Sequence, residues 1–68
     1  MVGWPDFTFA VFHKKHVVAV AWEVKLPGGK LRPEQENMKA LLTTPPNAWV
    51  YAVITSVDEA LAELKKYS

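Results

Sequence analysis

Four polar residues in the first half of the chain have the types and spacing of a site that holds a divalent cation beside a phosphate. Asp6 follows a proline, and Glu23 and Lys25 stand two residues apart at the end of an apolar segment. Two carboxylates, a main-chain carbonyl and waters are the hard oxygen ligands that suit Mg²⁺. A lysine beside them can orient a water or stabilise charge on a phosphoryl group. The fourth residue, Gln35, lies at the start of a predicted helix.

The pattern of apolar residues predicts the elements that position these side chains. Alternating aromatic and β-branched residues indicate strands, and apolar residues at helical spacing indicate helices. Pro33 suits the first position of a helix, and Ser56 with Glu59 has the form of a capping box. The predicted elements are strands at 7–12, 17–25 and 49–54 and helices that begin at 33 and 57. The fold class is therefore α+β, with a minimal three-stranded mixed sheet in the order ββαβα.

Topology brings the polar residues to one edge of this sheet. The short polar segment 13–16 joins the first two strands as an antiparallel hairpin, so Asp6 should lie beside Glu23. A right-handed crossover makes the third strand parallel to the second. Side chains alternate along a strand, so Glu23 and Lys25 share a face with Ala19 and Ala21, which leaves room for a ligand. The opposite, bulky face is expected to be core.

The helices are expected to bury one stripe each. Gln35 shares a face with Met38 and Leu42, so it should point towards the sheet and find its partner at the strand end of Glu23 and Lys25. In the last helix the predicted buried stripe is Val57, Ala60, Leu61 and Leu64. The third strand is apolar on both faces, which is typical of a buried central strand, and its Trp49 and Tyr51 are interpreted as core.

Each polar feature also has an ordinary interpretation when taken alone. Glu23 and Lys25 could form a cross-strand salt bridge, Pro5-Asp6 is a common turn, and Gln35 could be a surface residue. Their convergence on one edge favours a metal site. His13 and His16 could bind zinc, but solvated turn histidines are the better interpretation.

Composition limits the function classes. A chain of 68 residues is one domain, and without cysteine it has neither a disulfide framework nor a thiolate metal site. A net charge of +1 argues against a strongly basic nucleic-acid-binding surface, although basic residues do cluster in the hairpin and around the glycine turn. No signal peptide is expected, and the longest apolar run is too short to span a bilayer. We therefore expect an intracellular protein.

Four stretches, in this order, resemble a VRR-NUC domain, the virus-type replication–repair branch of the PD-(D/E)XK nuclease superfamily. They are GWPD at 3–6, WEVK at 22–25, GKLRPEQ at 29–35 and VITSVDEAL at 53–61. The resemblance covers nearly the whole chain and implies a restriction-endonuclease-like core. Domains of this family usually begin with a helix that carries a further acidic residue, whereas only two residues precede Gly3 here.

The resemblance implies roles for individual residues. Asp6 and Glu23 would be metal ligands together with the main-chain carbonyl of Val24, Lys25 would be the catalytic lysine, and Gln35 would support the site. It implies Mg²⁺ or Mn²⁺ as cofactor and a deoxyribonuclease that hydrolyses phosphodiester bonds. For stand-alone members it implies homodimers that cut branched DNA such as Holliday junctions. The basic residues expected to contact the DNA backbone are Lys14, Lys15, Lys30 and Arg32.

Two rival functions and an assembly state complete the predictions. The chain could be a catalytically weak DNA-binding or regulatory subunit with a nuclease-like fold. It could also be a protein-interaction module in which Asp6, Glu23 and Lys25 form a structural ion network. Half of the residues are hydrophobic, which is more than one small core needs. We therefore expect a homodimer that buries surface near Phe7, Phe9, Phe12 or the Trp49 strand.

Overall fold

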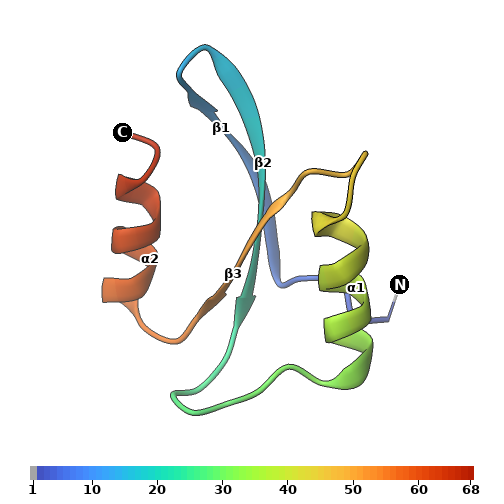
Figure 1. Ribbon diagram of the computed structural model, residues 1–68. Helices are drawn as coiled ribbons and strands as arrows, with labels where there is room; N and C mark the ends of the chain where they lie inside the picture. The colour runs from blue at the N-terminus through green and yellow to red at the C-terminus, as the bar shows by residue number, and fades with distance from the viewer. Residues whose placement is uncertain (1) are drawn as a thin grey trace.

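The computed structural model describes residues 2–68, and its elements follow the predicted order ββαβα. A three-stranded sheet stands between two helices, with α1 on one side and α2 on the other (Figure 1). The elements are β1 (Phe7–His13), β2 (His16–Val24), α1 (Pro33–Thr43), β3 (Val50–Ile54) and α2 (Val57–Lys65). The α+β fold class and the mixed sheet are therefore confirmed.

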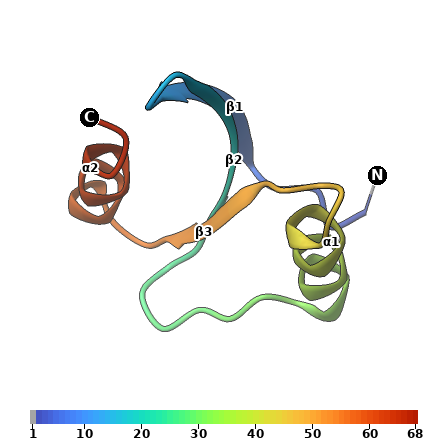
Figure 2. The same cartoon turned by 45° about the horizontal axis from the view of Figure 1, so that its top comes forward.

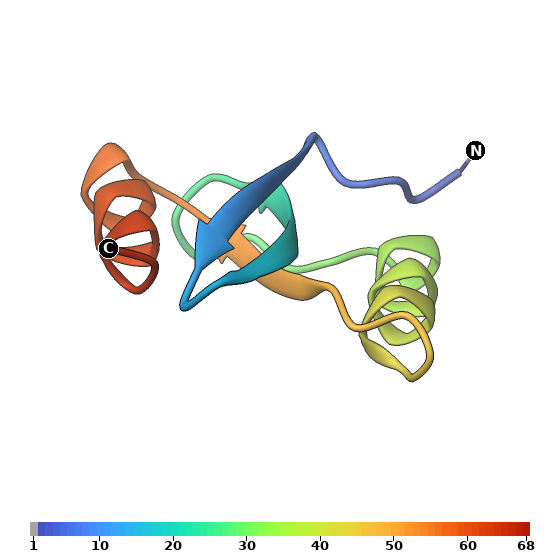
Figure 3. The ribbon, with the colours of Figure 1, turned by 90° about the horizontal axis from the view of Figure 1, so that it is seen from above.

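The sheet has the order β1-β2-β3, with β1 antiparallel and β3 parallel to β2. Both pairings were predicted, and the hairpin register places Phe7 opposite Trp22. The prediction that the third strand is central was wrong, because β2 lies between the other two strands and β3 is an edge. Elements lie on both sides of the sheet, as the view from above shows (Figure 3), so even an edge strand can be apolar on both faces.

A two-residue turn closes the hairpin. Its residues Lys14 and Lys15 both have positive φ angles, of 50° and 67°. This is the conformation of a type I′ turn, whose twist matches the right-handed twist of paired strands. The turn fixes the register, and the register determines which residues reach the other end of the hairpin.

The core has parts on both faces of the sheet. Val20 and Ile54 are buried on the bulky face, which is core only in part because Val24 there is 46% exposed. The other part lies between α1 and the small-residue face of β2. Ala21 is completely buried beneath Met38 and Leu42, and the partly buried rings of Trp49 and Tyr51 complete this cluster. The expectation of open space above Ala19 and Ala21 was therefore wrong. The small methyl groups let α1 pack against the sheet, and in Figure 2 the helix lies along this side of the strands. A polar site can open only beyond the core, where Glu23 follows Ala21.

Helix α2 packs far more loosely than predicted. Its first turn is capped as expected: Ser56 Oγ accepts the Glu59 N–H at 3.1 Å, and Glu59 Oε1 accepts the Thr55 N–H at 2.7 Å. The predicted buried stripe was nevertheless wrong, since no residue of α2 is buried and Val57 is 74% exposed. The helix contacts the sheet mainly near its N-terminus, so its apolar residues remain largely in solvent. Neither helix is long and apolar enough to cross a membrane.

Candidate active site

Asp6 lies where the sequence predicted it, beside the end of β2. Its Oδ2 accepts a hydrogen bond from the Val24 N–H at 2.8 Å. The preceding segment is held against the start of α1, because Gly3 has a φ of +85° and a Cβ there would lie 2.3 Å from the Glu34 carbonyl oxygen. Only glycine fits this contact without displacing the backbone. The glycine contact and the buried Pro5 thus fix the approach of Asp6 to the strand end.

Glu23 is the most unusual residue of the site. It is only 3% exposed, although it carries a carboxylate. One oxygen, Oε2, lies 3.9 Å from Lys25 Nζ. The other, Oε1, is buried and has no hydrogen-bond partner among residues 2–68. Glutamate is almost never fully buried without a partner, so this oxygen indicates a missing interaction.

The surroundings of Glu23 disfavour its charge. Burial is the main cause that raises the pKa of Glu23 above its ordinary value of 4.5, and the neighbouring Asp6 carboxyl raises it further. Lys25 and Arg32 act in the opposite direction but do not reverse the shift. Sites that hold a cation or transfer a proton commonly contain two neighbouring acids, one of which has a raised pKa.

Gln35 is buried on the sheet-facing side of α1, as predicted, but its observed partner is different. Its Oε1 accepts the backbone N–H of Arg32 at 2.8 Å, which closes the first turn of the helix. The expected partners were Glu23 and Lys25. The hydrogen bond arises because Arg32 occupies the N-cap position and makes no side-chain cap, so Gln35 satisfies the end of the helix from inside.

The four basic residues expected to contact DNA fall into two groups. Lys14 and Lys15 lie in the turn at the far end of the hairpin, roughly 25 Å from Asp6 at the rise of a β-strand. Lys30 and Arg32 lie in the loop between β2 and α1. Arg32 is near enough to act on the pKa of Glu23, and it pairs with Glu34 at 3.2 Å. Of the four basic residues, Arg32 is the one that the structure brings close to Glu23.

The donor set fits a divalent cation that keeps much of its hydration. Residues 2–68 contain no cluster of three or more His, Cys, Asp or Glu side chains that could enclose a metal ion. Mg²⁺ does not need one, since it is commonly held by one or two carboxylates together with waters and substrate phosphate. Asp6, Glu23 and the main-chain carbonyl of Val24 would be the protein ligands, and the unpartnered Glu23 Oε1 is the observation that supports this fit.

Sequence analysis missed Tyr51 as a polar residue of this region. Its ring belongs to the core, as interpreted, and Lys39 Nζ lies 5.8 Å from the ring centroid. Its hydroxyl, however, is buried without a hydrogen-bond partner among the described residues. Burial and then the charges of Glu23, Glu36 and Asp6 raise the pKa of Tyr51 above 10.0. The strand pattern could have placed Tyr51 on the face of Glu23, but it does not report where a long side chain ends.

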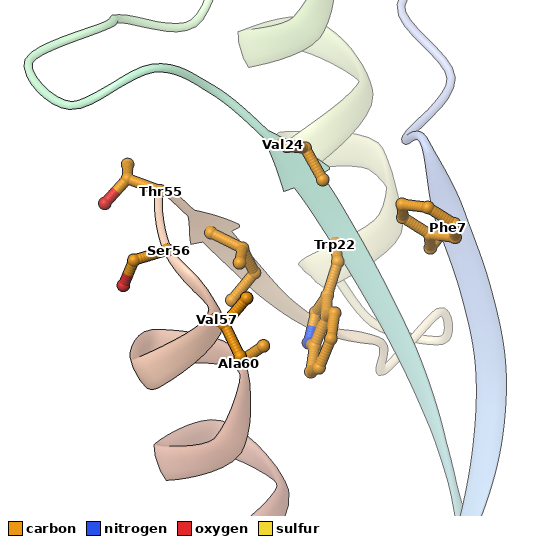
Figure 4. A pocket seen from close by; sticks show the side chains of 8 residues that line it. Phe7, Trp22, Val24, Thr55, Ser56, Val57 and Ala60 are labelled. Atoms are coloured by element: carbon orange, nitrogen blue, oxygen red, sulfur yellow. The ribbon is translucent and has the colours of Figure 1, made fainter.

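An apolar pocket of about 360 Å³ lies on the opposite face of the sheet (Figure 4). Its walls come from all three strands and from the start of α2. The lining residues are Phe7, Trp22, Val24, Ile54, Thr55, Ser56, Val57 and Ala60. Their chemistry is that of a surface for packing, not of a site for acid–base or metal chemistry.

No model of a protein family, no curated protein and no solved structure matches this chain. The membership in the VRR-NUC family therefore stays a prediction from the sequence motifs. The function has to be argued from the geometry of the site.

We expect the metal-free protein to lose stability as the pH rises above about 4.5. Glu23 titrates near that value when unfolded and at a higher pH when folded, so the folded state binds the proton more tightly. Its contribution is complete below 4.5 and is lost as the pH rises through the folded pKa. The pKa of Glu59 is lowered in the folded protein, so titration of this carboxyl changes the stability only below about pH 4.5.

Thermal denaturation in EDTA between pH 4.5 and 8 measures this slope. The Glu23→Gln variant is the control and should flatten the curve, because glutamine does not titrate. A parent protein whose melting temperature rises steadily across the window would contradict the prediction.

Proposed function

We propose that the protein is a metal-dependent endonuclease that hydrolyses phosphodiester bonds in DNA, with branched DNA as the substrate class. The observation that carries this proposal is the buried Glu23 carboxylate, which has one unpartnered oxygen and lies beside Asp6 and Lys25. The two acids and the lysine at this strand end belong to the sequence motifs that resemble those of VRR-NUC domains. A DNA substrate places the site of action inside a cell.

Each residue has a chemical task in this proposal. A divalent cation, when bound, polarises a phosphoryl oxygen and lowers the pKa of a water molecule. Asp6 would bind the cation through Oδ1, because Oδ2 accepts the hydrogen bond from the Val24 N–H. Lys25 would orient the attacking water or stabilise the negative charge that develops on the phosphate. Lys30 and Arg32 would contact the DNA backbone beside the site.

The test is incubation of the protein with a labelled four-way junction and Mg²⁺ or Mn²⁺. We expect cleavage that depends on the cation and disappears in EDTA, and we expect the cation to raise the melting temperature because it binds only the folded site. The Asp6→Ala variant should lose both effects, whereas Asp58→Ala, which removes an exposed acid on α2, should keep them. If the cation gives neither cleavage nor stabilisation, the three charges form a structural ion network. Stabilisation and junction binding without cleavage would indicate a regulatory subunit.

We further propose that the chain is a homodimer, which would present two sites to a symmetric junction. Phe7 is 58% and Phe12 is 71% exposed, and Phe7 also borders the apolar pocket beside α2. Phe9 and Trp49 are already covered, by Trp22 and Trp4 respectively. Leaving apolar surface in water costs about 25 cal/mol for each Å² that could be buried. Phe7 and Phe12 are five residues apart on β1, so their side chains lie on opposite faces, and the interface belongs at Phe7, beside the apolar pocket.

Sedimentation at micromolar concentration should give twice the chain mass of 7.7 kDa. The Phe7→Asp variant should shift the protein to the monomer, and Lys15→Asp in the exposed turn should not. A folded parent protein that sediments as a monomer would rule out the dimer and paired incision.

A further inference from the structure

Among residues 2–68, two buried polar atoms in the layer between β2, β3 and α1 have no hydrogen-bond partner. One is Glu23 Oε1 and the other is the Tyr51 hydroxyl. Tyr51 is the cross-strand neighbour of Ala21, two residues before Glu23 on the same face of β2. The two side chains therefore project from the same face of the sheet, the face on which α1 packs.

The other parts of both side chains already have contacts within the protein. Lys25 Nζ lies 3.9 Å from Glu23 Oε2, and Oε1 is the buried oxygen that has no hydrogen-bond partner among residues 2–68. The Tyr51 ring is held by the cluster of Ala21, Met38 and Leu42, so it cannot turn to solvent without breaking the core. A buried hydroxyl is a donor that usually finds an acceptor, and a buried carboxylate oxygen is an acceptor that needs a donor.

We propose that Tyr51 is a positioning residue of the candidate site, and that its hydroxyl and Glu23 Oε1 share one buried water molecule. The water accepts from Tyr51 Oη and donates to Glu23 Oε1, so both unpartnered atoms are satisfied at once. Burial, and then the charges of Glu23, Glu36 and Asp6, raise the pKa of the Tyr51 hydroxyl above its ordinary value of 10.0, so at neutral pH it is protonated and a donor. The catalytic part of the inference rests on the proposed nuclease function, whereas the bridge itself does not.

The bridge would orient Glu23 for its role as a ligand. A carboxylate oxygen has two acceptor sites, so Glu23 Oε1 can accept a hydrogen bond from the water and still be available to a cation. With Lys25 beside Oε2, the fixed water restricts rotation of the carboxylate, and such outer partners commonly determine the orientation of metal-binding side chains. The hydroxyl lies beneath α1 and not on the surface that DNA would touch. Its loss should therefore slow the chemistry and leave junction binding unchanged.

The first measurement is a double-mutant cycle in urea at pH 7 without metal, with Tyr51→Phe and Glu23→Met, because a glutamine oxygen could still accept the hydrogen bond from the water. If the two groups share a water, the effect of the double variant on the unfolding equilibrium constant should differ from the product of the two single effects by roughly threefold or more. The matched control replaces Tyr51→Phe with Tyr67→Phe, which removes the hydroxyl at the end of the chain, and its coupling factor should be close to one. A Tyr51–Glu23 factor that also equals one would overturn the inference.

The second measurement is single-turnover cleavage of the junction with Mg²⁺. Tyr51→Phe should lower the rate constant by about tenfold or more with an unchanged dissociation constant for the junction. If the parent protein does not cleave but the cycle shows coupling, the nuclease function fails and the shared water stands. Cleavage by Tyr51→Phe at the parental rate would overturn its positioning role.

Discussion

The Glu23→Gln variant is expected to lose metal-dependent cleavage of a four-way junction by about a thousandfold or more, and to be more stable than the parent in EDTA. Glutamine has nearly the same shape, so the packing beneath α1 is kept. The substitution removes a charge that burial and Asp6 disfavour. Neutralising a buried carboxylate whose surroundings disfavour its charge should stabilise the metal-free fold by about 1–2 kcal/mol. For a domain of this size that corresponds to a rise in melting temperature of roughly 4–16 °C.

The opposite signs of these two effects distinguish a functional site from a structural ion pair. If Glu23 existed to pair with Lys25, its neutralisation would lower stability, because an unpaired lysine would remain. The matched control is Glu63→Gln on α2, which removes a carboxylate that pairs with Lys66 on the other side of the sheet. It should leave cleavage unchanged. A Glu23→Gln protein that is less stable in EDTA and cleaves at the parental rate would reject the site.

The Leu42→Ala variant is expected to unfold much of the protein at 37 °C. Leu42 is 5% exposed and packs with Met38 on Ala21, and this small cluster attaches α1 to the sheet. Truncation of a buried leucine typically costs 2–5 kcal/mol. A domain of this length has a total stability of roughly 3–10 kcal/mol, so one cavity removes a large part of it. Chemical denaturation followed by tryptophan fluorescence measures the loss.

Leu41→Ala is the matched control for this experiment. It is the same substitution one residue earlier in α1, where the side chain is 56% exposed. The substitution should lower the free energy of unfolding by no more than about 1 kcal/mol, because the side chain buries little apolar area against the protein. Equal losses at 41 and 42 would mean that a partner covers the outer face of α1, and would contradict the packing described above.

Much of the site could be predicted because it depends on local periodicity. Side chains alternate along a strand, so the distance of two residues between Glu23 and Lys25 puts them on one face whatever lies above them. A short polar connection between two strands forces a hairpin, and the hairpin brings Asp6 to the end of β2, where its carboxylate accepts the Val24 N–H. The capping residues of α2 are equally local, and they were predicted correctly.

The errors concern interactions between elements that are distant in sequence. Both faces of β2 are apolar, so periodicity cannot tell which face a helix covers, and the smaller alanines proved to admit α1. Gln35 caps its own helix because Arg32 provides no side-chain cap. The exposed stripe of α2 reflects a helix whose contacts with the sheet are concentrated near its first turn. How closely such a helix packs depends on the length and angle of its connection to β3, which composition does not encode.

The sequence by itself determined the elements, their order, the pairing of the strands and the meeting of Asp6 with Glu23, because these follow from backbone periodicity and chain connectivity. Only the tertiary structure decided that Glu23 is almost completely buried, that one of its oxygens has no partner among the described residues 2–68, and that the Tyr51 hydroxyl lies in the same layer. These properties depend on which side chains close over a residue from three separate elements. Burial and hydrogen bonding are properties of that packing, and no pattern along the chain records them.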